Sequence, residues 1–208
     1  MIEIAHPDDR PELVEDAKKA KILYKDQIFV PESAYFYPSN VSSRTTLNNG
    51  EELRFRAIRP SDEEEMRRLF YRFSDEAVYY RYFSPIKTMP HHKMQQYVNI
   101  DYRTTLSIVG LVGDPGVGRI IAEGRFVKHA DKPFGDVAFV VDEAYQGKGI
   151  ATKLCTMLLE HARERGLKGF TADVLVSNKA MMKVFEKIGL PVRARLSGAA
   201  YELTIDFG

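Results

Sequence analysis

The fold of this chain is decided by the stretch Val137-Ala-Phe-Val-Val-Asp-Glu-Ala-Tyr-Gln-Gly-Lys-Gly-Ile-Ala-Thr-Lys-Leu154. Val137 to Val141 are apolar and mostly β-branched or aromatic, which is typical of a central strand covered on both faces. Gln146-Gly-Lys-Gly149 then predicts a sharp turn, because glycine adopts backbone conformations that other residues avoid. The stretch therefore predicts a buried strand, a glycine turn and a helix.

The helix is expected to begin at Ile150, because one apolar face is shared by Ile150, Leu154, Met157, Leu158 and Ala162. A glycine turn that opens a helix leaves backbone N–H groups unpaired at the positive end of the helix dipole. Such an end is well suited to a phosphate group. The first functional hypothesis is therefore a site for a phosphorylated ligand.

The composition is typical of a soluble globular protein, since 44% of the 208 residues are hydrophobic and 28% are charged. The formal net charge of +1 gives no bulk electrostatic reason to expect nucleic acid or a membrane surface as a partner. No apolar run approaches the roughly 18 residues of a membrane span. The acidic, polar start of the chain does not fit a signal peptide.

A single cysteine, Cys155, excludes an intrachain disulfide and a thiolate metal cluster. We therefore expect a cytoplasmic protein without a metal ion. The sequence does not determine whether it is a monomer or a homodimer.

Residues 1–50 differ from the rest of the chain. Residues 28–38 combine prolines and aromatic side chains without a clean period, and residues 39–50 are polar and end in the turn signal Asn48-Asn49-Gly50. We interpret residues 1–50 as an N-terminal extension that packs on or links to the domain, and residues 51–208 as that domain.

Within residues 51–208, strand patterns cover 52–58, 104–112, 117–127 and 169–175, with one or two closing strands in 192–207. Amphipathic helices are expected before 74, over 74–84, over 90–98 and after Asn178. Ser61 and Glu64 match a capping box at the start of the first of these. Together these strands and helices predict an α/β (α+β) fold in three layers, with helices on both faces of a mixed sheet.

The segment Gln146-Gly-Lys-Gly-Ile-Ala151 resembles the Gln/Arg-x-x-Gly-x-Gly/Ala signature of the GNAT family of N-acetyltransferases. The block from Asn178 to Phe185-Glu-Lys-Ile-Gly-Leu190 and the segment Arg59-Pro-Ser-Asp62 are similar to further parts of that family. The resemblance covers roughly residues 52–207. It implies a GNAT-like three-layer fold with a mixed, mostly antiparallel central sheet.

Three more segments resemble the acetyltransferase domain of bacterial protein-lysine acetyltransferases: Arg56-Ala-Ile-Arg-Pro60, Tyr80-Arg-Tyr-Phe-Ser-Pro85 and Asn99-Ile-Asp-Tyr102. This resemblance implies direct transfer of an acetyl group from acetyl-CoA to an amine, with a protein lysine as the preferred acceptor. A small-molecule amine is the alternative acceptor. An acyl-CoA-binding sensor module with little activity is the alternative from another class.

The resemblance also implies which residues bind coenzyme A: Phe139, Val140, Val141, Gln146, Gly147, Lys148, Gly149, Ile150, Ala151, Asn178 and Phe185. Backbone N–H groups of 146–151 would hold the pyrophosphate. The strand edge 139–141 would pair with the pantetheine arm, and the N–H of Val140 or Val141 would polarise the thioester carbonyl. For Asn178, a helix N-cap is an equally good interpretation.

The general base is expected at Asp136, where the related lysine acetyltransferases have a glutamate. Aspartate is one methylene shorter, so a water relay is favoured over direct contact. Glu123, expected on the preceding strand beside Asp136, is the alternative base, with a strand-end salt bridge as its structural interpretation. An acceptor lysine, with a reference pKa of about 10.4, needs such a base to become a nucleophile.

The position of the tyrosine acid that many family members use is occupied by Phe185 here, so solvent is expected to protonate the leaving thiolate. Cys155 lies one turn inside the helix. We interpret it as a packed small side chain and not as a nucleophile.

Overall fold

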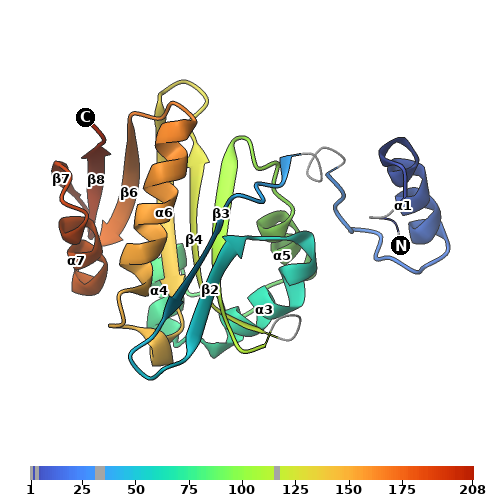
Figure 1. Ribbon diagram of the computed structural model, residues 1–208, viewed down its shortest axis with the longest axis horizontal. Helices are drawn as coiled ribbons and strands as arrows, with labels where there is room; N and C mark the ends of the chain where they lie inside the picture. The colour runs from blue at the N-terminus through green and yellow to red at the C-terminus, as the bar shows by residue number, and fades with distance from the viewer. Residues whose placement is uncertain (1, 3–4, 31–35, 115–117) are drawn as a thin grey trace.

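The protein is built on one eight-stranded sheet, seen here in a computed structural model that describes residues 2, 5–30, 36–114 and 118–208 (Figure 1). The strands are β1 (Ser42–Thr46), β2 (Glu52–Ala57), β3 (Thr105–Val112), β4 (Arg119–Lys128), β5 (Phe134–Val141), β6 (Gly169–Leu175), β7 (Val192–Ser197) and β8 (Ala200–Asp206). The α-helices are α1 (Arg10–Lys19), α3 (Glu63–Arg72), α4 (Asp75–Tyr82), α5 (His91–Val98), α6 (Ile150–Glu164) and α7 (Lys179–Lys187). Short 3-10 turns are η2 (Pro7–Asp9), η3 (Pro60–Asp62) and η4 (Glu143–Tyr145).

The strand order is β1-β2-β3-β4-β5-β6-β8-β7, and all neighbours are antiparallel except β5 and β6. The parallel pair is short, since it joins only Phe134–Asp136 to Gly169–Thr171. Beyond this point β5 continues to Val141 and β6 to Leu175 without pairing to each other. The sheet therefore opens between its two halves.

Helices cover both faces of the sheet. A Cβ on Gly124 of β4 would meet Phe139 of β5 and Leu154 of α6, so these residues share the face that α6 covers. Glu123, the next residue along β4, turns to the opposite face and meets Tyr97 of α5. The ring centres of Phe139 and Phe185 of α7 lie 6.1 Å apart, so α6 and α7 cover the same face. The opposite face is covered by α4 and α5, whose residues Arg81 and Tyr97 meet Glu123.

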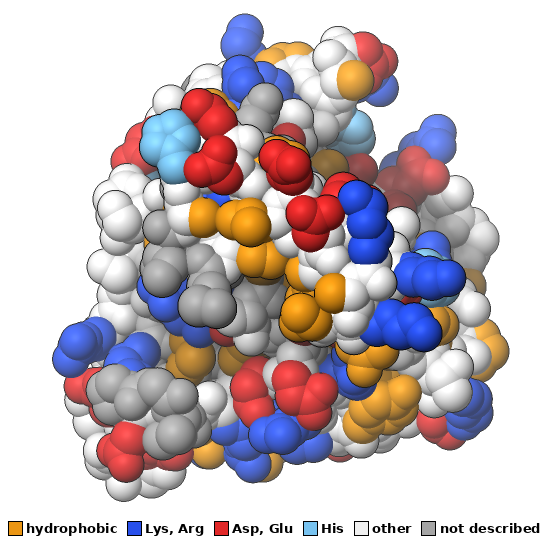
Figure 2. Space-filling view, turned by 90° about the vertical axis from the view of Figure 1, so that its right-hand side faces the viewer, with side chains coloured by type: hydrophobic (Ala, Val, Ile, Leu, Met, Phe, Trp, Pro, Cys, Tyr) orange, Lys and Arg blue, Asp and Glu red, His pale blue; other side chains and the backbone are white. Residues whose placement is uncertain are grey.

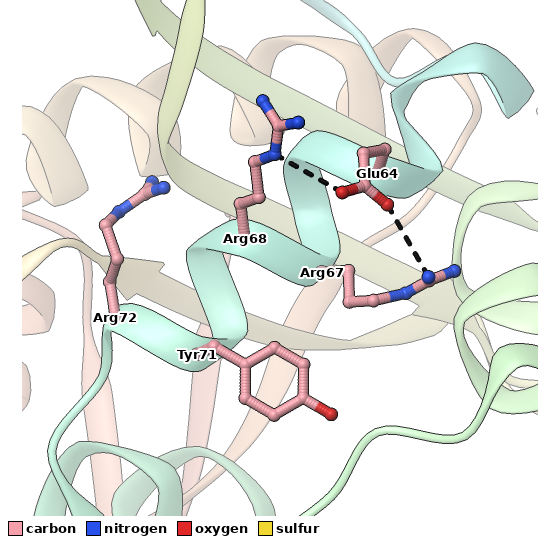
Figure 3. A pocket seen from close by; sticks show the side chains of 5 residues that line it. All are labelled: Glu64, Arg67, Arg68, Tyr71 and Arg72. Carbon is pink, nitrogen blue, oxygen red and sulfur yellow. Dashed lines mark hydrogen bonds and ion pairs between the residues drawn. The ribbon is translucent and has the colours of Figure 1, made fainter.

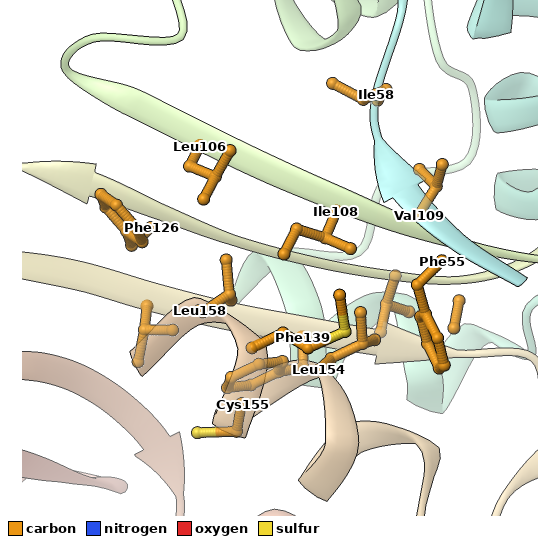
Figure 4. Packing of buried hydrophobic residues seen from close by; sticks show 14 of the residues in the cluster. Phe55, Ile58, Leu106, Ile108, Val109, Phe126, Phe139, Leu154, Cys155 and Leu158 are labelled. Carbon is orange, nitrogen blue, oxygen red and sulfur yellow. The ribbon is translucent and has the colours of Figure 1, made fainter. Parts of the chain in front are cut away.

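The core is a single cluster of buried apolar side chains that runs along both faces of the central strands (Figure 4). Leu106, Ile108 and Phe126 are fully buried, as are Leu154 and Leu158 of α6. Gly124 and Gly135 have no room for a Cβ, because Phe139 and Leu167 lie 2.8 and 2.9 Å from where it would stand. The strands of the centre are thus held in register by close packing, which fixes the edge of β5 relative to α6.

The three-layer α/β fold with a mixed, mostly antiparallel sheet is confirmed. The expected capping box of Ser61 and Glu64 is wrong. Asp62 takes that role instead, because its buried carboxylate accepts the N–H of Arg59 at 2.8 Å and also binds the guanidinium of Arg56 at 2.6 and 2.7 Å.

Residues 1–50 combine a peripheral helix with an edge strand. Figure 1 shows α1 beyond the β1 side of the sheet, away from the C-terminus. Residues 24–28 contact α5: Gln95 Oε1 accepts the Ile28 N–H at 3.2 Å, and the rings of Tyr24 and His91 lie 4.6 Å apart. β1, which the sequence analysis did not foresee, pairs with β2. The division into an extension and a domain at residue 50 stays a prediction.

Figure 2 shows the face of the molecule on this N-terminal side, where acidic and basic side chains are interspersed with small apolar areas and neither charge dominates. No helix in the described part of the chain is long and apolar enough to cross a bilayer. The cytoplasmic location stays a prediction.

Candidate active site

A cavity of about 780 Å³ fills the opening between β5 and β6. Its walls come from five elements: residues 136–141 of β5, residues 172–174 of β6, the polar and aromatic side of α4, the start of α6, and one side of α7 from Ala180 to Lys187. The glycine turn after β5 closes one end. The cavity therefore joins most of the positions that the sequence selected, and it exists because the parallel pairing stops at Asp136 and Thr171.

The glycine turn presents a row of free backbone donors. Gly147 and Gly149 have φ angles of 75° and 79°, a left-handed conformation that disfavours other residues. A Cβ at either position would meet no protein atom within 4 Å, so the space beside them is open. Among the described residues, nothing accepts the backbone N–H groups from Gly147 to Thr152. The turn can therefore donate several hydrogen bonds to an anion at the start of α6.

The direction of β5 decides which backbone N–H faces the cavity. Asp142 N–H donates to the Ile121 carbonyl oxygen at 2.7 Å, so N–H groups at even positions of β5 point toward β4. Successive N–H groups alternate along a strand, which turns that of Val141 toward the cavity and that of Val140 away from it. The Val141 carbonyl agrees with this direction, since it accepts Nε2 of Gln146 from the turn at 3.2 Å.

The remaining expected binding residues lie at the same cavity, with one exception. Asn178 caps α7 by accepting the Met181 N–H at 3.1 Å, and it also lines the cavity. Phe185 is 1% exposed and forms part of the wall with Phe139. Lys148 does not line the cavity, because its Nζ lies 4.5 Å above the ring of Tyr145. The ammonium group of Lys148 therefore already has a partner in the Tyr145 ring.

Asp136 lies on the α4 side of β5, at the point where the strands separate. Its Oδ1 accepts a hydrogen bond from the hydroxyl of Thr171 on β6, and Nε2 of His129 lies 3.3 Å from the same oxygen. The carboxylate is exposed and lines the cavity. Asp136 is therefore placed to meet a polar group that enters the cavity.

Glu123 does not lie beside Asp136, and the expected adjacency is wrong. Glu123 pairs with Val140, whereas Asp136 pairs with Val127 near the other end of β5. The antiparallel register of β4 and β5, which a sequence pattern does not specify, sets this separation. Glu123 is also absent from the cavity wall.

Glu123 is instead the centre of a buried ionic network. It is fully buried, and its carboxylate accepts hydrogen bonds from Ser107 Oγ and Arg125 Nε, each at 2.6 Å, and from Tyr97 Oη at 2.9 Å. Arg81 lies 3.8 Å away. Burial opposes ionisation, but the charges of Arg125 and Arg81 and the Ser107 hydrogen bond outweigh it and hold the pKa of Glu123 below its usual range. A carboxylate held this way is a weak base.

The glycine turn, the strand edge with a free N–H and the carboxylate at the strand junction all line one cavity. Residues 62–190 match the profile of the acetyltransferase (GNAT) family. The chain belongs to the acetyltransferase (GNAT) family. The matched range starts just before α3 and ends just after α7, so it contains every wall of the cavity.

Two relatives and one solved structure are similar to this chain. It is 32% identical to "Acetyltransferase Pat" of Mycolicibacterium smegmatis over 76% of this chain and 45% of that protein. It is 26% identical to "Acetyltransferase PA5475" of Pseudomonas aeruginosa over 65% of this chain and 73% of that one. The crystal structure of the GNAT domain of S. lividans PAT superposes with a TM-score of 0.73 at 28% identity, covering 82% of this chain and 99% of that domain. The chain thus spans less than half of the Mycolicibacterium relative.

Two residues at this GNAT site were missed by the sequence analysis. Arg81 of α4 lines the cavity and donates to Tyr97 Oη at 2.6 Å. Asp173 of β6 lines it as well, two residues beyond the partner of Asp136. An alternating strand pattern marks Asp173 as facing solvent, but only the pairing of β5 with β6 indicates that it faces Asp136.

Cys155, by contrast, is fully buried and does not line the cavity. Burial raises the pKa of its thiol to about 12, so the thiol stays protonated near neutral pH. Its interpretation as a packed side chain is consistent with this position.

A second, shallow depression lies on the outer face of α3, lined by Glu64, Arg67, Arg68, Tyr71 and Arg72 (Figure 3). Its arginines are already paired: Arg67 and Arg68 with glutamates of the same helix, and Arg72 with Asp142 at 2.8 Å. The pairs of Arg67 and Arg68 within α3 are ordinary features of a helix surface, and Arg72 is held by the buried carboxylate of Asp142. This depression is therefore not a candidate for the GNAT chemistry.

Proposed function

We propose that this protein transfers the acetyl group of acetyl-CoA directly to an amine, and that the acceptor is a lysine side chain of a protein. The observation that carries the proposal is the cavity between β5 and β6, which has unpaired N–H groups at one end and a carboxylate on its wall. These are the groups that binding a phosphorylated thioester and deprotonating an amine require.

The chain fits coenzyme A in two respects. The open space beside Gly147 and Gly149, together with the free N–H groups of 147–152, suits a pyrophosphate at the start of α6. The unpaired edge of β5 at Phe139 and Val141 suits the amide groups of a pantetheine arm, which would pair with it as a strand does. These two features lie on one cavity, as a single extended ligand requires.

Acetyl-CoA supplies the thioester whose carbonyl carbon the amine attacks. Asp136 accepts the proton of the acceptor ammonium, directly or through a water molecule. The Val141 N–H donates to the thioester oxygen as negative charge develops on it. A C–N bond forms, and the nitrogen loses a second proton as the C–S bond breaks. That proton reaches the departing thiolate through solvent, since Phe185 has no hydroxyl to donate, and Asp136 releases the first proton to solvent.

Asp136 is a better candidate base than Glu123 for a geometric reason. Asp136 is exposed to the cavity, whereas Glu123 is fully buried and its carboxylate already accepts three hydrogen bonds. Protonation of Glu123 would also leave the guanidinium groups of Arg81 and Arg125 without their counter-charge. Glu123 therefore serves to hold α4 and α5 against β4.

A protein lysine is favoured as acceptor by the resemblance to protein-lysine acetyltransferases and by the likeness to the GNAT domain of S. lividans PAT. The test combines two measurements on the unmodified protein. Calorimetry with acetyl-CoA and coenzyme A gives the affinity, and a thiol-release assay measures transfer to lysine-containing proteins, lysine peptides and a panel of small amines. We expect binding of both acetyl-CoA and coenzyme A, and thiol release with a lysine-containing protein.

The outcomes separate the alternatives. Transfer only to small amines would indicate that the acceptor is a metabolite and not a protein. Tight binding without turnover on any amine would instead indicate a sensor module. Lack of binding would contradict the assignment of the cavity.

A further inference from the structure

Asp173 is the one acidic side chain on the cavity wall for which the described residues provide no hydrogen-bond or ion-pair partner. Glu76 accepts the hydroxyl of Tyr80 at 2.7 Å, and Glu143 accepts the Ser74 N–H at 2.9 Å. Asp136 is held by Thr171 and His129. A carboxylate that lines a cavity and is left without a partner by the fold is available to a ligand.

Asp173 and Asp136 face the same space. Thr171 pairs with Asp136 across the parallel strands and donates a side-chain hydrogen bond to it, so these two side chains share a face of the sheet. Asp173 follows two residues later on β6 and therefore points to the same face. The strands diverge from this point, which leaves room between the two carboxylates and the beginning of the cavity.

The cationic side chains that line the cavity are either paired with other residues or lie on the opposite face of the sheet. Arg81 is engaged with Tyr97 and Glu123. Lys183 and Lys187 belong to α7, which covers the opposite face of the sheet. On β8, Glu202 lies opposite Asp173 and is paired with Arg195 at 2.9 Å. The surroundings of Asp173 are therefore acidic.

These surroundings raise the pKa of Asp173, first through partial burial and then through the negative charges of Asp136 and Glu202. Two carboxylates that repel each other are stabilised when a cation enters between them. The protonated amine of a lysine is a compact cation with three donors, which can bind both carboxylates at once.

We propose that Asp173 is the second carboxylate of the acceptor site and binds the incoming ammonium together with Asp136, which makes the site selective for cationic primary amines. This inference rests on the proposed function. Asp173 supplies affinity and charge selectivity, while Asp136 remains the proton acceptor.

The test is the kinetics of Asp173→Asn with a lysine peptide as acceptor. We expect the KM for the peptide to rise about tenfold, the value of a lost charged hydrogen bond, while kcat and the KM for acetyl-CoA stay within about twofold. Asp173→Glu keeps the charge and should recover most of the peptide affinity. Calorimetry with the peptide and the coenzyme A-bound protein should show the same loss for Asp173→Asn.

Glu202→Gln is the matched control, because it removes a neighbouring charge that is paired with Arg195 and does not line the cavity. It should leave the peptide KM unchanged. An unchanged peptide KM in Asp173→Asn, or an equal rise in Glu202→Gln, would overturn the role of Asp173 while leaving the transferase in place. Lack of transfer to any amine by the unmodified protein would overturn both proposals.

Discussion

Tyr97 donates a hydrogen bond of 2.9 Å from its hydroxyl to Glu123 Oε2, and it joins α5 to the central strand β4 through this contact. The guanidinium of Arg125 lies 3.4 Å from the centre of the Tyr97 ring, and Arg81 donates to the Tyr97 hydroxyl. Three secondary-structure elements, α4, α5 and β4, are thus tied together behind the wall of the cavity. Because α4 forms part of that wall, the network fixes the shape of the acceptor side.

Glu123→Gln should destabilise the protein strongly. Removing one charge from a buried ionic group leaves the guanidinium groups of Arg81 and Arg125 uncompensated, at a cost of about 3–5 kcal/mol. Urea unfolding followed by circular dichroism measures this change. Glu52→Gln is the control, because Glu52 forms only loose surface pairs, and its change should stay within about 0.5 kcal/mol.

The same network gives a pH dependence. The pKa of Glu123 is lower in the folded protein than in the unfolded chain, so its ionised form stabilises the fold above the unfolded value of about 4.3. This contribution is lost as the pH falls through the lower, folded pKa. The difference in unfolding free energy between the unmodified protein and Glu123→Gln should therefore shrink as the pH is lowered below about 4. A difference in unfolding free energy that grows as the pH falls would contradict a lowered pKa of Glu123.

Gly147→Ala should impair both the fold and coenzyme A binding. The φ of 75° costs an alanine about 1–2 kcal/mol. The new methyl group would also enter the open space that we assign to the phosphates, so calorimetry should show weaker coenzyme A binding. Gly198→Ala, at a φ of 59° in the β7–β8 turn, should lose a similar stability but keep the affinity. Equal affinities for all three proteins would remove the glycine turn from the site.

Asp136→Asn should reduce kcat by about 10²- to 10⁴-fold, the range of a positioned general base, with little change in acetyl-CoA affinity. The amide keeps the size of the side chain and the hydrogen bond to Thr171 but cannot take up a proton. Thiol release over a range of pH, beside calorimetry, provides the measurement. An unchanged rate and pH profile would exclude Asp136 as the base.

Cys155→Ala should retain full acetyl transfer. The thiol is buried, and its pKa of about 12 keeps it protonated, so it cannot carry the acetyl group during turnover. Iodoacetamide at pH 7.5 should also leave the native protein active. Formation of an acetylated enzyme in the absence of acceptor, lost in Cys155→Ala, would require a two-step transfer instead.

The glycine turn could be found from sequence because its cause is local. The periodicity changes from a buried run at 137–141 to a helical face from Ile150, and two glycines lie between them; this pattern reflects backbone geometry and nothing distant. The three-layer fold follows from similar local patterns. The start of α3 was misassigned because the buried partner of Asp62, Arg56, lies on the preceding strand.

The site itself depends on pairings between distant strands. By itself the sequence determined a strand, a turn and a helix that can hold an anion, since these follow from residues adjacent in the chain. Only the tertiary structure decided that Glu123 lies opposite Val140 and away from Asp136, that the Val141 N–H and not that of Val140 faces the cavity, and that Asp173 joins Asp136. The reason is that register and strand order come from packing over the whole sheet, where a shift of one residue would exchange the two faces.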